Sequence, residues 1–207
     1  MNNDNASLFA EGLKQLNLTL DPSGQQTLLD FLRFLKKWNK AYNLTAITDL
    51  STMISHHLLD SLSIAPFIAG NNILDVGSGA GFPGIPLAVY FPQKQWTLLD
   101  SNGKKIRFLI QAKSELHLSN INIIQARAEQ WSSPQRFDTI VTRAVGSIPD
   151  LIAKTKQHLR PGGRWLFMTG HSELSELNHW QPKPEIYPLH IPGISAPRYV
   201  IIITANN

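Results

Sequence analysis

From residue 71 onward, short apolar runs and amphipathic stretches follow one another in a regular order, and this order constrains the fold more than any other feature of the chain. It predicts a mostly parallel sheet whose strands are joined by helices packed on both faces. The tail differs, because only a proline-containing loop separates two apolar runs near 185–190 and 198–204, which predicts an antiparallel hairpin. In chain order, the segments before the tail are NNILDV, PLAVYF, QWTLLD, KIRFLIQAKSEL, INIIQA, FDTIVT, LIAKTKQHL and RWLFMT.

The region before residue 67 has the pattern of helices. We expect an N-terminal helical extension over residues 1–66, packed on a core domain at 67–207. The basic face of its main helix is interpreted as solvated surface rather than as an RNA contact, and Trp38 and Tyr42 as core residues rather than a base-stacking platform. The apolar residues at helical spacing are Leu28, Phe31, Leu32, Leu35 and Trp38, and the basic residues are Arg33, Lys36, Lys37 and Lys40.

Length and composition narrow the class of protein. A chain of 207 residues that is 43% hydrophobic suits one compact domain with a real core. It has no cysteine, which excludes disulfides, thiolate zinc sites and a cysteine nucleophile. The N-terminal MNNDNASLFAEG does not resemble a signal peptide, and no apolar stretch is long enough to span a bilayer, so we expect a cytoplasmic protein. The net charge of +4 favours a polyanionic partner.

The segment DVGSGAGFPG, residues 75–84, follows the first predicted strand and places glycines where a strand turns into a helix. Ligands of such sheets bind at this edge, where glycines let the backbone approach and the helix N-terminus offers free N–H groups. Gly79, Gly81 and Gly84 satisfy G-x-G-x-x-G, so a nicotinamide or flavin nucleotide is one candidate ligand, and a purely structural turn is another interpretation. Asp75, however, would repel a pyrophosphate and attract a cation.

S-adenosylmethionine fits this requirement, because it carries a sulfonium, an ammonium and a carboxylate around one adenosine. The carboxylate could take the N–H groups of the glycine turn, with the ammonium near Asp75. Asp100 ends the second predicted strand, 23 residues after Gly77, close to the spacing at which an acidic residue meets ribose hydroxyls. The alternative role for Asp100 is that of a helix N-cap.

Several motifs together resemble the class I S-adenosylmethionine-dependent methyltransferases, which have a Rossmann-like fold. More specifically, the chain resembles the RsmG (also called GidB) family of bacterial ribosomal RNA methyltransferases over nearly its whole length. That resemblance implies methylation of N7 of one guanine in 16S rRNA, with S-adenosylmethionine as the cofactor and 16S rRNA or the small ribosomal subunit as the partner. The motifs are DVGSGAGFPGIPLA, LLDSNGKKIRFL, FDTIVTRA and LRPGG, with the more specific WNKAYNLT (38–45) and HLLDSL (57–62).

The resemblance also implies roles for individual residues. It gives Gly77 and Phe82 to the cofactor loop, and it gives Ala128 and Glu129 to the adenine end. Arg143 follows the fourth predicted strand and is expected to face the transferred methyl group and the substrate; the alternative is a surface arginine. The complete predicted cofactor set is Asp75, Gly77, Gly79, Gly81, Phe82, Asp100, Ala128, Glu129 and Arg143.

The sequence also departs from the family's pattern after the fifth strand. Members of the family tend to have Lys-Gly there, and this chain has Thr169, Gly170 and His171, so a cationic substrate contact at that point is in question. His171 is a candidate to replace part of it.

The residues after the fourth strand bear on the kind of methylation. Methyltransferases that modify exocyclic amines usually carry Asn-Pro-Pro-aromatic at this point, and here the chain reads Thr142-Arg143-Ala144-Val145, which disfavours amine methylation. Methylation of carbon 5 of a pyrimidine needs a cysteine nucleophile, and the chain has no cysteine. The N7 atom of guanine already has an in-plane lone pair and loses no proton when it attacks. Such a reaction needs no general base and depends on alignment and exclusion of water.

Basic residues outside the cofactor set are candidates for RNA contact. Lys104, Lys105 and Arg107 begin a predicted helix, where an RNA phosphate would offset their unfavourable interaction with the helix dipole; a solvated helix face is the alternative. Arg198 precedes the last strand and matches a family arginine, and it could also be an ordinary edge residue. Adjacent His56 and His57 point in different directions on a helix, so we expect no metal site.

Three rival functions stay open from the residues alone. They are a small-molecule methyltransferase, a nicotinamide-dependent oxidoreductase and a non-enzymatic RNA-binding module. A monomer is expected, and the sequence does not distinguish free RNA from the assembled subunit as substrate.

Overall fold

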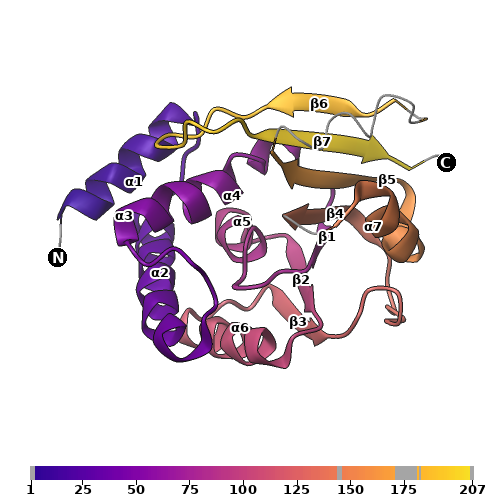
Figure 1. Cartoon of the computed structure of the whole chain (residues 1–207), viewed down its shortest axis with the longest axis horizontal. Helices are drawn as coiled ribbons and strands as arrows, with labels where there is room; N and C mark the ends of the chain where they lie inside the picture. The colour runs from indigo at the N-terminus through magenta and orange to yellow at the C-terminus, as the bar shows by residue number, and fades with distance from the viewer. Residues whose placement is uncertain (1–2, 144–145, 171–180, 182, 206–207) are drawn as a thin grey trace.

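The computed structural model describes residues 3–143, 146–170, 181 and 183–205. Its centre is one seven-stranded sheet in the order β3-β2-β1-β4-β5-β7-β6 (Figure 1). The first five strands pair in parallel, and β7 lies antiparallel between β5 and β6, which confirms the predicted sheet and C-terminal hairpin. The strands are β1 (Asn72–Val76), β2 (Gln95–Asp100), β3 (Ile121–Gln125), β4 (Phe137–Arg143), β5 (Leu159–Thr169), β6 (Glu185–Pro188) and β7 (Tyr199–Thr204).

Helices cover both faces of this sheet, because alternate side chains of each strand point to opposite sides. In β1, Ile73 joins one hydrophobic cluster, which includes the apolar side chains of α5 and α6, whereas Leu74 joins a second cluster beneath α7. The parallel strands are therefore apolar on both faces, as buried strands require. The helices are α5 (Gly84–Tyr90), α6 (Gly103–Glu115) and α7 (Ile148–Thr155), the last continued by a 3-10 turn (Lys156–His158).

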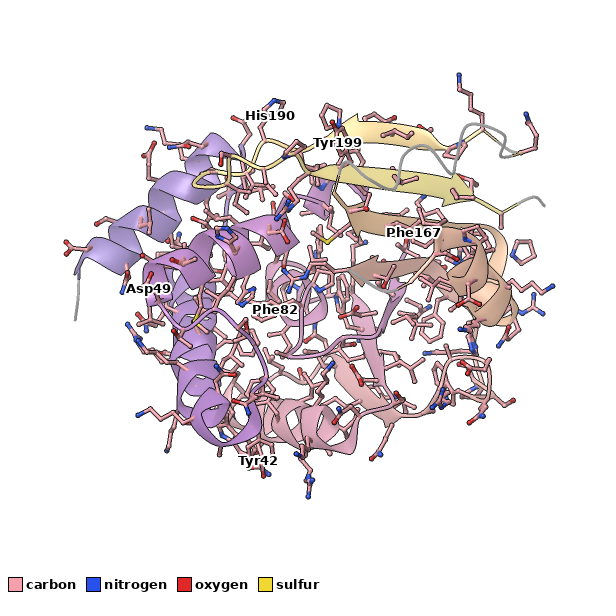
Figure 2. All side chains as sticks on the ribbon, in the orientation of Figure 1. Tyr42, Asp49, Phe82, Phe167, His190 and Tyr199 are labelled. Carbon is pink, nitrogen blue, oxygen red and sulfur yellow. The ribbon has the colours of Figure 1, made fainter. Side chains whose placement is uncertain are left out.

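The N-terminal helices share a continuous hydrophobic cluster with the first face of the sheet. The Phe31 ring centroid lies 5.3 Å from that of Phe82 and 6.2 Å from that of Phe108, and Trp38 also packs against Phe108. Figure 2 shows Phe82 in the interior, between these helices and the sheet. The elements are α1 (Asn3–Gln15), α2 (Pro22–Tyr42), α3 (Leu50–Met53), a π-helical turn (Ile54–Leu59), α4 (Asp60–Leu62) and a 3-10 turn (Ala65–Phe67).

The π-helical turn sits inside an otherwise continuous helix that runs from α3 into α4. Asp49 caps the start of this helix by accepting the backbone N–H of Thr52 at 2.8 Å. A π turn adds a residue to one helical turn and occurs often at functional sites. Here it carries His56 and His57 and leads directly into Asp60. The sequence pattern indicated a helix but not this irregular turn.

The strand order reverses between β1 and β4, because the chain proceeds from β1 to β2 on one side and from β4 to β5 on the other. In such sheets, ligands bind outside the carboxyl ends of the strands at this switch point. Within the described ranges, no helix combines the length and apolar character that crossing a membrane requires.

Candidate functional site

The first cavity of interest lies at the carboxyl ends of β1, β2 and β3 and has a volume of about 180 Å³. It brings together Gly77, Asp100, Ala128 and Glu129, four of the residues predicted to form the cofactor site. Because it borders the glycine-rich segment, we name it the glycine-turn cavity. Its lining residues are Val76, Gly77, Leu99, Asp100, Ser101, Ala126, Arg127, Ala128, Glu129, Leu151 and Lys154.

The glycine turn is tied to the end of β2 by backbone hydrogen bonds. The Gly77 N–H donates to the Leu99 carbonyl at 2.8 Å, and the Gly79 N–H donates to Asp100 Oδ2 at 2.9 Å. Gly79 has φ of 59° and Gly81 has φ of 93°, a region that side chains strongly disfavour. At Gly81 an added Cβ would also lie 2.6 Å from Ile85. The chain therefore needs glycine to bring this backbone against β2.

Asp100 has both carboxylate oxygens hydrogen-bonded to backbone N–H groups. Besides the bond from Gly79, Oδ1 accepts from the Asn102 N–H at 2.8 Å. Helix α6 is capped by Asn102, whose Oδ1 accepts from the Lys104 N–H at 2.9 Å. Asp100 thus precedes the cap and joins the glycine turn to the start of α6. Each oxygen can accept a further hydrogen bond, so a ribose contact stays a prediction.

Asp75 lies beneath the glycine turn and is fully buried. Its Oδ2 accepts the Gly84 N–H at 3.0 Å, and in the described part of the chain its Oδ1 has no hydrogen-bond partner. Burial raises the pKa of this carboxyl from 3.8 to about 7, against the opposing effects of the Gly84 N–H, the Ser78 hydroxyl and the Arg143 charge. Asp75 thus has one fixed hydrogen bond and a carboxyl group whose ionisation is opposed by burial. Groups with strongly shifted pKa values are common at functional sites.

The three basic residues predicted to touch RNA at the start of α6 do not share one environment. Lys104 and Arg107 are exposed, in line with either RNA contact or a solvated face. Lys105 Nζ instead lies 3.8 Å from Asp100 Oδ2 and close to Gly79. The Lys105 ammonium therefore neighbours the glycine turn, and its contact with RNA stays a prediction.

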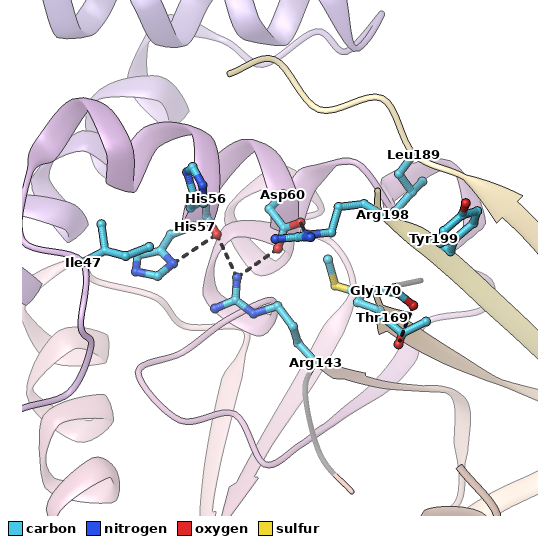
Figure 3. Close-up of a pocket in the computed structure, with 11 residues that line it drawn as sticks. Ile47, His56, His57, Asp60, Arg143, Thr169, Gly170, Leu189, Arg198 and Tyr199 are labelled. Carbon is cyan, nitrogen blue, oxygen red and sulfur yellow. Dashed lines mark hydrogen bonds and ion pairs between the residues drawn. The ribbon is translucent and has the colours of Figure 1, made fainter. Parts of the chain in front are cut away.

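A second cavity, of about 440 Å³, opens where the π turn, β4, β5 and β7 meet (Figure 3). It contains Arg143 and Arg198, two predicted site residues from distant parts of the chain, so we name it the arginine cavity. Thr169 and Gly170 line it as well, whereas Ala144, Val145 and His171 lie outside the described residues. The lining residues are Ile47, His56, His57, Asp60, Arg143, Met168, Thr169, Gly170, Leu189, Arg198 and Tyr199.

Arg143 is held in one orientation by groups from the π turn and α4. One guanidinium nitrogen, NH1, donates to the His56 carbonyl and to Asp60 Oδ2, each at 3.0 Å. The guanidinium carbon lies 5.1 Å from the centroid of the Phe82 ring, a cation–π distance. These contacts fix the Arg143 side chain, which is 23% exposed, and its facing of the transferred methyl group and the substrate stays a prediction.

Phe82 supports this arrangement from the glycine-rich segment. Its ring stacks on His57 with centroids 4.5 Å apart and an interplanar angle of 22°. His57 Nε2 lies 2.9 Å from Thr45 Oγ1, and burial together with the Arg143 charge lowers the pKa of His57 from 6.5 to about 4. His57 is therefore neutral near pH 7. The Phe82 side chain is buried among protein side chains. Its contact with the cofactor stays a prediction.

Asp60 carries the negative charge of the arginine cavity. Its side chain is 6% exposed, with Oδ2 bonded to Arg143 and Oδ1 lying 3.7 Å from Arg198 Nε. Burial raises the pKa of this carboxyl, and the two arginines oppose that rise. Oδ1 has an ion-pair neighbour in Arg198 but accepts no hydrogen bond from the residues that the structure describes.

The two cavities are neighbours at the switch point of the sheet. Val76 lines the glycine-turn cavity, and its carbonyl accepts the Thr142 hydroxyl at 3.0 Å. Thr142 directly precedes Arg143, which lines the arginine cavity. Across the described ranges, no cluster of three or more His, Cys, Asp or Glu side chains is arranged to hold a metal ion.

Comparison with known proteins identifies the family. The family model described as "GidB: rRNA small subunit methyltransferase G" matches residues 24–198. A curated relative, the ribosomal RNA small subunit methyltransferase G of Coxiella burnetii (strain Dugway 5J108-111), is 48% identical over 196 residues, covering 95% of this chain and 96% of the relative. The chain belongs to this GidB family. The resemblance inferred from the sequence motifs is thereby confirmed.

Solved structures add an independent view of the fold of this GidB-family chain. A putative O-methyltransferase from Klebsiella pneumoniae superimposes with a TM-score of 0.61, at 13% identity and covering 94% of both chains. The N-methyltransferase NodS of Bradyrhizobium japonicum WM9, solved with S-adenosyl-L-homocysteine, gives a TM-score of 0.59 at 18% identity, covering 83% of this chain and all of NodS. Both confirm the class I methyltransferase fold.

Asp60 is the charged residue of the arginine cavity that the sequence analysis of this family member did not predict. Asp60 lies in HLLDSL, a segment used above only as a family motif. The available signal was a carboxylate in ISHHLLDSLSIAPF (54–67), a run that otherwise holds no Asp, Glu, Lys or Arg, since a buried acid needs a cationic or hydrogen-bonding partner. Its partners, Arg143 and Arg198, are 83 and 138 residues further along the chain, so local pattern did not reveal them.

Proposed function

We propose that this protein transfers the methyl group of S-adenosylmethionine to N7 of one guanine of 16S rRNA in the small ribosomal subunit. The observation that carries the proposal is the pair of neighbouring cavities at the switch point, one beside the glycine turn and one containing Arg143. Membership of the GidB family supports ribosomal RNA as the substrate. Donor and base would meet across Val76 and Thr142.

The glycine-turn cavity has the chemistry that S-adenosylmethionine requires. N–H groups of the turn would bind its carboxylate, Asp100 would accept from the ribose, and Ala128 with Glu129 would flank the adenine. The buried Asp75 carboxyl, with one oxygen that accepts no hydrogen bond among the described residues, fits a nearby positive charge. When bound, the cofactor supplies an electrophilic methyl group on a sulfonium.

The arginine cavity fits a substrate that needs no general base. His57 is buried, neutral and bonded to Thr45, so it is poorly placed to take a proton. Arg143 is fixed by Asp60 and the His56 carbonyl, and it can position the base or its phosphate without losing that support. The contribution of these residues is orientation and the exclusion of water, which N7 alkylation requires.

One experiment tests the proposal against its rivals. Small subunits lacking the modification are incubated with S-adenosylmethionine labelled in the methyl group, and the labelled nucleoside is identified after nuclease digestion. We expect 7-methylguanosine at one position of 16S rRNA. Label on a metabolite would favour a small-molecule methyltransferase. Transfer to no acceptor would favour a binding module, and binding of NAD but not of S-adenosylmethionine would favour an oxidoreductase.

The same assay on naked 16S rRNA and on assembled subunits identifies the physiological acceptor. A markedly higher rate on one of them assigns the substrate, because the contacts required for alignment would be complete only there.

A further inference from the structure

The carboxylate of Asp60 is the unusual group of the arginine cavity. It is the one acidic side chain among the described lining residues, which also include two arginines and two histidines. Arg143 occupies one of its oxygens, whereas Oδ1 accepts no hydrogen bond within the described part of the chain. A buried carboxylate oxygen without a hydrogen bond is costly, and the cost would be removed by a ligand that donates to it.

The chemistry of guanine determines which side of the base such an acceptor can hold. O6 and N7 are acceptors on one edge, and N1–H with the N2 amino group are donors on another. A guanidinium that binds O6 and N7 together would occupy the lone pair that must attack the methyl group. An acidic acceptor at N1–H and N2–H leaves that lone pair free.

Charge supports the same arrangement. During transfer the methyl–sulfur bond breaks with its electrons going to sulfur, and the N7 lone pair forms the new bond. One positive charge thereby moves from the sulfonium to guanine, and no proton leaves. Arg143 and Arg198 would oppose this charge in the cavity, and a carboxylate on the donor edge of guanine would stabilise it.

We propose that Asp60 is a specificity-determining residue that accepts the N1–H and N2–H groups of the target guanine. This inference rests on the proposed function, because it names how the same site recognises its base. Oδ1 provides the unfilled acceptor, and Oδ2 can accept from guanine while keeping the bond from Arg143, since each oxygen has two lone pairs. Asp60 would thus bind the base and position Arg143.

The test combines a protein variant with a substrate analogue. Subunits are reconstituted with 16S rRNA carrying either guanosine or inosine at the target position; inosine lacks the N2 amino group but keeps N1–H, O6 and N7. The proteins are the wild type and Asp60→Asn, with Asp30→Asn as the matched control. Asp30 is half-exposed on α2, and in the described part of the chain its side chain pairs with Gln26 and Arg33 of the same helix. We measure kcat/KM for methyl transfer and, with S-adenosylhomocysteine bound, the Kd for each subunit.

We expect inosine to lower kcat/KM and affinity about 10- to 100-fold for the wild type and for Asp30→Asn. For Asp60→Asn the same replacement should cost less than about threefold, because the charged acceptor of the N2 amino group is already gone. An equal inosine penalty in wild type and Asp60→Asn overturns the inference and leaves Asp60 as a positioning residue for Arg143. Absence of an inosine penalty in the wild type also overturns it.

Two further readouts separate this inference from the proposed function. The Kd for S-adenosylmethionine and the unfolding transition of Asp60→Asn report whether its cofactor site and fold are intact. If this variant does not fold, the smaller neutral variant Asp60→Ser replaces it under the same criterion, so an inosine penalty equal to that of the wild type overturns the inference. A third outcome contradicts only the proposed function: the wild type transfers no methyl group, yet it still binds guanosine-containing subunits more tightly than inosine-containing ones, and this difference depends on Asp60.

Discussion

The most informative single perturbation is Asp75→Asn, which removes a buried ionisable group but keeps the shape of the side chain. In the folded protein, burial raises the pKa of Asp75 to about 7, compared with 3.8 for an ordinary aspartate. Above pH 4 the unfolded chain therefore ionises this group while the folded protein keeps it protonated until about pH 7. The free energy of unfolding consequently falls as the pH rises through this window.

The size of the effect follows from the width of that window. Each pH unit over which only the unfolded state is ionised lowers the free energy of unfolding by about 1.4 kcal/mol. Between pH 5 and pH 8 the wild type should lose about 3 kcal/mol relative to Asp75→Asn. Asparagine can still accept the Gly84 N–H, so the variant retains the bond that holds the start of α5.

Denaturant unfolding of both proteins at pH 5, 6, 7 and 8 measures this difference. We subtract the two free energies at each pH, because His57 and Asp60 titrate alike in both proteins. A difference that stays constant over this range would refute the assignment of a raised pKa to Asp75.

Binding of S-adenosylmethionine supplies the functional half of the same prediction. If its positive groups lie near Asp75, they favour the ionised carboxylate, so lowering the pH from 8 to 6 should weaken binding to the wild type about tenfold more than binding to Asp75→Asn. Calorimetry at these two pH values measures both affinities. The amino group of the cofactor titrates equally in the two experiments and cancels in the comparison.

Four further perturbations test other parts of the site. Asp100→Ala should weaken S-adenosylmethionine binding about 10- to 100-fold in calorimetry, and unchanged binding would contradict its ribose role. As the pH falls from 6.5 to 4, His57 should lower the free energy of unfolding of the wild type by about 3 kcal/mol, because in this range only the unfolded chain protonates the imidazole. In His57→Phe this loss should be absent, which denaturant unfolding at both pH values measures. Gly84→Ala places a Cβ 2.6 Å from Asp75 Oδ2 and should lower the unfolding free energy by about 1–3 kcal/mol, measured by denaturant titration. Arg143→Lys should lower kcat/KM for methyl transfer at least about tenfold, because one ammonium does not reproduce the guanidinium contacts with Asp60, the His56 carbonyl and Phe82. A near-normal kcat/KM would mean that a positive charge at this position is sufficient for methyl transfer.

The sequence by itself was sufficient to predict the sheet, its helices and the glycine turn. Strand and helix patterns are local, and the preferred connections between parallel strands leave few arrangements for such a series. The position of ligand residues at strand ends is equally local for Gly77 and Asp100, whereas Ala128 and Glu129 were expected from the family resemblance; all four line one cavity.

Only the tertiary structure decided which charged groups meet and how deeply they are buried. Asp60 begins α4, Arg143 ends β4 and Arg198 directly precedes β7, and their pairing depends on how these distant parts of the chain pack together. Lys105 likewise lies beside Asp100 because the glycine turn and α6 converge at the end of β2. Electrostatic energies depend on distance and solvent exposure in space, and neither quantity is encoded in the spacing of residues along the chain.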